Sequence, residues 1–116
     1  MPVEKKEVDV PTFIPVYFAN NSAVVADTYK AELDRVAQCL KNDQELRIQL
    51  AGYASNVGNV EYNKALSARR CNAVKQYIES KGVDGKKMEI KPCGIDYDAK
   101  QAEKARRVDV IVIEVR

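Results

Sequence analysis

The C-terminal segment Val108–Val115, with the sequence VDVIVIEV, constrains the fold of this chain more than any other segment. Its central residues Val110–Ile113 are apolar without a break, so an extended strand would be apolar on both sides there. Strands of this kind are typical of the interior of a sheet rather than its edge. The segment therefore predicts an internal strand.

Three further segments have strand patterns, and they cover residues 12–18, 46–50 and 87–91. In the second of them, Leu46, Ile48 and Leu50 alternate with polar residues, which indicates a half-buried strand. Pro15 lies inside the first, and because proline has no backbone N–H to donate, it predicts an edge strand or a bulge. A loop with two glycines is expected from Gly52 to Asn59.

Apolar spacings of three and four residues predict helices over Asp27–Lys41 and Val60–Lys81, and a short helix is expected over Asp98–Arg106. The element order is β-α-β-α-β-β. We therefore predict an α+β fold, a two-layer sandwich in which helices pack on one face of a mixed four-stranded sheet. Residues 1–11 are expected to form a lead-in or linker, and residues 12–116 a single domain.

The composition excludes several classes of function. Histidine is absent, which excludes Ser-His-Asp and Cys-His catalysis and histidine metal sites. The three cysteines form no CxxC pair, so neither a zinc cluster nor any other metal site is expected. The net charge is only +2 and the pI about 8.4, below the range typical of nucleic-acid binding. No cofactor motif occurs, so none is expected.

The N-terminal sequence MPVEKKEVDV has no apolar core of a signal peptide, and the longest apolar run is far too short to span a membrane. Two interpretations remain open: a cytoplasmic protein, or a domain of a longer exported or anchored chain. In the second case, any membrane association would come from other parts of that chain.

The second long helix interrupts its own apolar stripe. On a wheel with about 100° per residue, the apolar side chains occupy one arc. Asn63, Ser67 and Arg70 fall inside that arc, all in the N-terminal half of the helix. The same side of the helix is therefore polar at its start and apolar at its end.

A buried arginine without a partner is costly, and two interpretations of Arg70 compete. In one, Arg70 pairs with an internal carboxylate or extends to solvent at the sheet edge. In the other, the polar cluster lines a pocket at the carboxyl end of the second strand, where the helix N-terminus and the amides of Gly58 and Asn59 also point. That pocket would suit an anionic ligand, with the Arg70 guanidinium binding a carboxylate.

The segment from Gly52 to Val83 has a recognisable set of residues at fixed spacings. They are Gly52, Tyr53, Gly58, Tyr62, Asn63, Leu66, Ser67 and Arg70. This set resembles the signature of OmpA-like domains, which bind peptidoglycan in outer-membrane proteins, peptidoglycan-associated lipoproteins and flagellar stator proteins. The C-terminal ARRVDVIV and the early NNSA resemble further family elements, so the resemblance covers residues 12–115.

The resemblance implies a pocket for the diaminopimelate of a peptidoglycan stem peptide. Arg70 would hold a carboxylate of the ligand, Asn63 would hydrogen-bond nearby, Arg106 or Arg107 would border the pocket, and the loop after Gly52 would cover it. The expected ligand-binding residues are therefore Ala54, Ser55, Gly58, Asn63, Arg70, Arg106 and Arg107.

The sequence departs from the family where a Thr-Asp pair is replaced by Ala54-Ser55, and an asparagine by Ala105. Ser55 carries no charge for a ligand ammonium, and losing a charge-assisted hydrogen bond costs about 1.5–3 kcal/mol. Asn56, Asp96 and Asp98 are candidate substitute acceptors.

Three functions are compared. The first is a non-catalytic cell-wall anchoring module with an altered diaminopimelate pocket. The second is a degenerate domain without peptidoglycan binding that acts as a structural or protein-interaction module in an envelope assembly. The third, an enzyme, is disfavoured because no nucleophile-and-base arrangement can be identified. The family implies a location on the periplasmic face of the envelope, within a larger outer-membrane or lipid-anchored protein.

Overall fold

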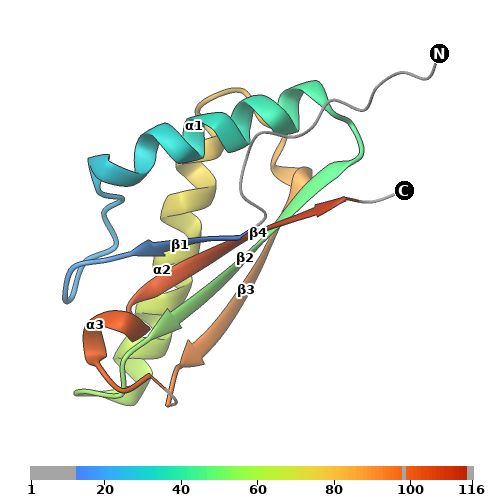
Figure 1. Cartoon of the computed structure of the whole chain (residues 1–116). Coiled ribbons are helices and arrows are strands. Elements are labelled where there is room, and N and C mark those ends of the chain that lie inside the picture. Colours follow the sequence, from blue (N-terminus) through green and yellow to red (C-terminus); the bar gives the residue numbers. More distant parts are fainter. Residues whose placement is uncertain (1–12, 98, 115–116) are drawn as a thin grey trace.

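The computed structural model describes residues 13–97 and 99–114, so the expected lead-in of residues 1–11 lies outside the described residues. The predicted α+β class and element order are confirmed (Figure 1). The elements are β1 (Phe13–Tyr17), α1 (Asp27–Asn42), β2 (Leu46–Ala54), α2 (Val60–Glu79), the 3-10 turn η1 (Gly85–Lys87), β3 (Met88–Ile95), α3 (Ala102–Ala105) and β4 (Arg107–Glu114).

The four strands form one mixed sheet in the order β1-β4-β2-β3. Strand β4 runs antiparallel to both of its neighbours, β1 and β2, whereas β2 and β3 are parallel. The interior position predicted for the C-terminal strand is therefore confirmed. The edge position predicted from Pro15 is confirmed as well, because β1 pairs only with β4 within this sheet.

Several predicted boundaries were wrong. Strand β2 continues through Ala54, although a loop was expected from Gly52, and β3 continues to Ile95 rather than ending at Lys91. The reason is that β2 and β3 pair along this whole length, with a register shift between Gly52 and Tyr53 that accommodates one extra residue in β3. Helix α3 has only four residues, shorter than the helix expected over residues 98–106.

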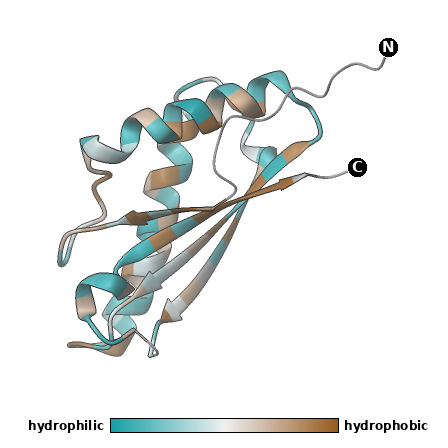
Figure 2. Ribbon diagram, in the orientation of Figure 1, coloured by the Kyte–Doolittle hydropathy of each residue, from teal (hydrophilic) through white to brown (hydrophobic). Residues whose placement is uncertain are grey.

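The core lies between the sheet and the two long helices, which cover one face of it (Figure 1). In Figure 2 the hydrophobic colour runs along β4 and recurs in bands on α1 and α2. Alternate β4 residues, Val108 and Val110, are fully buried, whereas Ile113 is 37% exposed on the opposite face. The main contributors from the other elements are Val16, Leu33, Val36, Leu40, Leu46, Ile48, Leu50, Val74 and Ile78.

Helix α2 and strand β2 approach each other closely at Gly52. A Cβ atom at this position would lie 2.5 Å from Cys71 Sγ and 2.6 Å from the Ser67 carbonyl oxygen. Only glycine allows this approach, which brings the polar half of α2 to the carboxyl end of β2. Cys71 is fully buried beside it, and burial raises the pKa of its thiol to about 12, which leaves it unreactive at neutral pH.

Within residues 13–97 and 99–114, no helix has the length and apolar character that crossing a membrane requires.

Candidate functional site

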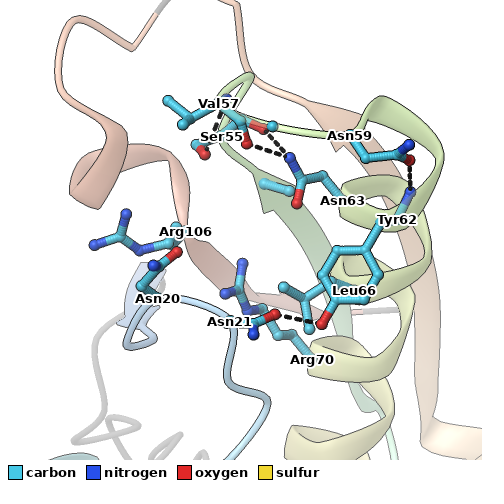
Figure 3. A pocket seen from close by; sticks show the side chains of 12 residues that line it. Asn20, Asn21, Ser55, Val57, Asn59, Tyr62, Asn63, Leu66, Arg70 and Arg106 are labelled. Atoms are coloured by element: carbon cyan, nitrogen blue, oxygen red, sulfur yellow. Dashed lines mark hydrogen bonds between the residues drawn. The ribbon is translucent and has the colours of Figure 1, made fainter.

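A cavity of about 250 Å³ opens where β2 ends and α2 begins (Figure 3). Its wall is built from three parts of the chain: the turn after β1, the end of β2 with its following loop, and the first turns of α2, together with Arg106 before β4. The lining residues are Asn20, Asn21, Ala54, Ser55, Val57, Gly58, Asn59, Tyr62, Asn63, Leu66, Arg70 and Arg106. Two of the three polar residues that interrupt the α2 stripe, Asn63 and Arg70, therefore line this cavity. The third, Ser67, is buried outside the lining and donates to the Lys64 carbonyl at 2.7 Å.

The guanidinium of Arg70 is the dominant charge of this cavity. The residue is 0% exposed, and its planar group is held by the turn after β1. Its Nε donates to the Ser22 carbonyl at 2.8 Å and its Nη2 to the Ala19 carbonyl at 3.2 Å, while the group lies 5.4 Å from the Phe18 ring centre. The third nitrogen, Nη1, is buried and has no hydrogen-bond partner.

The first interpretation of Arg70, in which it pairs with an internal carboxylate or extends to solvent, does not describe this arrangement. In the described part of the chain no carboxylate forms an ion pair with Arg70, and the side chain does not reach solvent. Burial lowers the pKa of Arg70 to about 10, with a further contribution from the charge of Arg106. The group remains cationic at neutral pH, so its unpaired N–H is suited to an anionic acceptor.

The loop above the cavity is held by Asn63. Its Nδ2 donates to the carbonyl oxygens of Ser55 at 3.2 Å and Val57 at 2.8 Å. The Ser55 hydroxyl accepts a hydrogen bond from the Val57 amide at 3.4 Å, and Gly58 follows with a φ of +94°, which favours glycine. Asn63 thus shapes the roof of the cavity rather than leaving its amide N–H groups open to a ligand.

The start of α2 closes the side of the cavity. Asn59 caps the helix, because its side-chain oxygen accepts from the Tyr62 amide at 2.8 Å. The Tyr62 hydroxyl in turn donates to Asn21, which joins the helix to the turn after β1 (Figure 3). The positive end of the helix dipole therefore lies at the cavity edge, where it adds to the attraction for an anion.

The lining carries two positive charges, those of Arg70 and Arg106, and no aspartate or glutamate is among its residues. Several of its oxygens already accept a hydrogen bond within the chain. These oxygens belong to Asn21, Ser55, Val57 and Asn59. The cavity therefore combines two positive charges with no carboxylate among its lining residues.

Six of the seven residues expected to bind a ligand meet at this cavity: Ala54, Ser55, Gly58, Asn63, Arg70 and Arg106. The seventh, Arg107, is not among the lining residues. Adjacent positions on a strand face opposite sides of the sheet, and Arg107 lies on the side that the helices leave uncovered.

Arg107 is engaged within the chain. Its Nη1 lies 2.9 Å from Asp96 Oδ2, its Nε lies 3.0 Å from Asp109 Oδ1, and the group stacks 4.2 Å from the Tyr53 ring centre. Asp96, a candidate substitute acceptor, is therefore bound to Arg107 and does not line the cavity. Asn56 does not line it either, and Asp98 lies outside the described residues.

The sequence interpretation missed the contribution of the turn after β1. The segment NNSA, which contains Asn20 and Asn21, was noted only for its resemblance to a family element, whereas both asparagines line the cavity. The positive φ of Asn21, 59°, directs this turn toward α2, and such a backbone conformation is more common for asparagine than for most residues. The paired asparagines were a signal for a special turn, although not for its partner on α2.

Among the described residues, no group of three potential metal ligands of the Asp, Glu, His or Cys type occurs.

The family model of the OmpA family matches residues 17–108. The chain is 38% identical over 73 residues to a peptidoglycan-associated lipoprotein of Rhizobium meliloti, covering 63% of this chain and 42% of that protein. It is 34% identical over 98 residues to the peptidoglycan-associated lipoprotein of Haemophilus influenzae, covering 79% of this chain and 64% of that protein. The chain thus spans less than two thirds of the length of these relatives.

Among solved structures, the peptidoglycan-associated lipoprotein of Burkholderia pseudomallei matches with a TM-score of 0.76 and 31% identity, covering 85% of this chain and 89% of that chain. The C-terminal domain of MotB from Helicobacter pylori matches with a TM-score of 0.69 and 17% identity, covering 86% of this chain and 84% of that chain, a likeness of fold.

Proposed function

The chain belongs to the OmpA family, and on this basis we propose that it is a peptidoglycan-binding domain whose cavity holds a carboxylate of the stem peptide at Arg70. The names of the similar proteins, peptidoglycan-associated lipoproteins among them, support this class of ligand. The proposal places the domain in the cell envelope, facing the periplasm as part of a larger protein.

The observation that carries the proposal is the buried Nη1 of Arg70 without a partner. A buried donor left without an acceptor costs about 1–3 kcal/mol, and more when it is charged. A ligand carboxylate reaching Nη1 would remove this cost. The free protein therefore holds a cation in place for an acceptor that the described chain does not supply.

The size of the cavity favours one end of an amino acid as its occupant. Its volume, about 250 Å³, is below the roughly 300–1,000 Å³ of sites that enclose a drug-sized molecule. A diaminopimelate-type side chain carries a carboxylate at its end and fits this description, whereas a disaccharide does not. The glycan would remain outside.

Within this proposal the residues divide into three roles. Arg70 binds the carboxylate, and Arg106 contributes positive charge at the rim. Asn63 and Gly58 shape the roof, together with Ala54 and Ser55 at the end of β2. Arg107 has a structural role on the other face of the sheet, and no residue is assigned a catalytic role.

The competing function is a domain that has lost its ligand and serves only in protein contacts within the envelope. Such a domain would gain nothing from an arginine held in a cavity with an unsatisfied N–H group. The buried Nη1 of Arg70 therefore favours ligand binding over this alternative.

Co-sedimentation with purified sacculi tests the proposal. We expect retention of the unaltered protein and its loss in Arg70→Ala. Arg69→Ala is the matched control, because Arg69 is the neighbouring exposed arginine and the change in net charge is the same. Equal retention of Arg70→Ala and Arg69→Ala, or no retention of the unaltered protein, would contradict the proposal and favour the protein-contact alternative.

A further inference from the structure

The cavity differs in one respect from a site for a free amino acid, which carries an ammonium group next to its carboxylate. Such a site needs an anion or open acceptors for the ammonium as well as a cation for the carboxylate. This cavity has two arginines and no acidic side chain among its lining residues.

Several of the oxygens that line the cavity already accept a hydrogen bond within the chain. Asn63 Nδ2 donates to the carbonyls of Ser55 and Val57, the Ser55 hydroxyl accepts from the Val57 amide, and Asn59 accepts from Tyr62. The two nearby acidic residues in the sequence are elsewhere: Glu61 is exposed outside the lining, and Asp96 pairs with Arg107. An ammonium here would meet two cations and no carboxylate among the lining residues.

We infer that this cavity selects a carboxylate whose neighbouring amino group is acylated, and discriminates against the same carboxylate beside a free ammonium. Acylation turns the nitrogen into a neutral amide, which removes the charge that Arg70 and Arg106 repel and leaves the carboxylate for Arg70 Nη1. The inference rests on the proposed function and specifies the chemical state of the ligand.

Two parts of peptidoglycan have this chemistry. One is the diaminopimelate of a cross-linked stem peptide, whose side-chain amino group is acylated by a neighbouring peptide. The other is the C-terminal residue of any stem peptide, whose nitrogen is part of the peptide bond. The shared group is an N-acyl amino acid carboxylate.

Competition for sacculus binding tests the inference with three probes: meso-diaminopimelate, its mono-N-acetyl derivative, and N-acetyl-D-alanine. We expect mono-N-acetyl-diaminopimelate to displace the protein at a concentration about tenfold lower than free diaminopimelate, because like charges placed together are strongly unfavourable. If N-acetyl-D-alanine competes as well as the acetylated diaminopimelate, the source is the peptide terminus; if it competes more weakly, the source is the cross-link.

Ser55→Asp supplies the missing charge at the cavity wall, and Ser55→Asn is the matched neutral control of the same shape. We expect Ser55→Asp to reverse the preference toward free diaminopimelate and Ser55→Asn to leave it unchanged. Thermal unfolding establishes that both variants are folded. The comparison of the three probes on the unaltered protein does not depend on either variant.

The outcomes separate the two proposals. Arg70-dependent sacculus binding with equal or stronger competition by free diaminopimelate overturns the inference and leaves the proposed function intact. Arg70-dependent binding that none of the probes displaces overturns the inference as well. Absence of Arg70-dependent binding to sacculi overturns both.

Discussion

Arg70 and Arg107 are both buried or half-buried arginines at the same end of the sheet, yet their surroundings differ in kind. Arg107 meets two carboxylates and an aromatic ring, and its position joins the end of β3 to the start of β4. Arg70 meets two backbone carbonyls and the Phe18 ring, has no carboxylate partner among the described residues, and retains one buried N–H without a partner. Under the proposed function, Arg107 stabilises the fold and Arg70 is held for a ligand.

The comparison predicts that substitutions at the two positions separate binding from stability. For Arg70→Met we expect affinity for sacculi to fall at least about 100-fold, which corresponds to about 2.7 kcal/mol. The free energy of unfolding should fall by only about 1 kcal/mol, because the loss of the hydrogen bonds to Ala19 and Ser22 is partly offset by the removal of a buried charge without a carboxylate partner. Sedimentation binding and urea denaturation measure the two effects. A loss of stability larger than the loss of binding would make Arg70 a structural residue.

For Arg107→Met we expect the reverse. Asp109 is 5% exposed, and without Arg107 its carboxylate lacks its ion-pair partner, so the free energy of unfolding should fall by about 2 kcal/mol. Affinity for sacculi should change less than about threefold, since the residue does not line the cavity. A tenfold loss of affinity in a folded Arg107→Met protein would place Arg107 in the binding site and contradict the difference in role proposed for Arg70 and Arg107.

A smaller effect on affinity is expected at Asn63, which holds the loop above the cavity that contains Arg70. Asn63→Ala removes the two hydrogen bonds to Ser55 and Val57, and we expect affinity to fall about tenfold through a loosened loop. Tyr62→Phe is a milder comparison, because it removes only the hydroxyl contact with Asn21. Unchanged affinity in Asn63→Ala would show that the roof does not contribute to binding.

The smallest expected effect is a pH dependence on the Arg107 side. Burial raises the pKa of Asp109, while the nearby Arg107 charge acts in the opposite direction. A raised pKa in the folded state favours the protonated form, so the associated stability is present below the unfolded pKa and is lost as pH rises through the folded one. Arg107→Met should raise the pKa of Asp109 further.

The stability difference between the unaltered protein and Arg107→Met should therefore shrink, by about 1 kcal/mol, between pH 7 and pH 4. Urea denaturation across this range measures it, with Arg69→Met as a control that should show no such trend. A stability difference that stays constant or grows on acidification contradicts this account of Asp109.

The same two arginines show what the sequence could and could not predict. The burial of Asn63, Ser67 and Arg70 on one helix face followed from helical period alone, because that period is local. The placement of Arg107 depended on where β4 begins and on Asp96, a partner immediately after the end of β3, and both were set by strand pairing. The carbonyls of Ala19 and Ser22 that hold Arg70 lie about 50 residues away in the chain, which no local pattern reveals.

The strands likewise show that local patterns could be predicted from the sequence, whereas features set by pairing between distant segments could not. The interior position of β4 and the edge position of β1 were predicted from apolar content and from Pro15. The extension of β2 past Gly52 was not predicted, because glycine locally favours a turn while pairing with β3 maintains the strand. The absence of a side chain at Gly52 allows α2 to approach β2 closely, and it does not end the strand.

The most direct test of the central claim is a crystal structure of the protein with mono-N-acetyl-diaminopimelate. The account predicts a carboxylate oxygen of the ligand within about 3 Å of Arg70 Nη1, with the contacts of Arg70 to Ala19 and Ser22 retained. A ligand bound elsewhere, or a cavity in which Arg70 turns to an internal carboxylate, would contradict it.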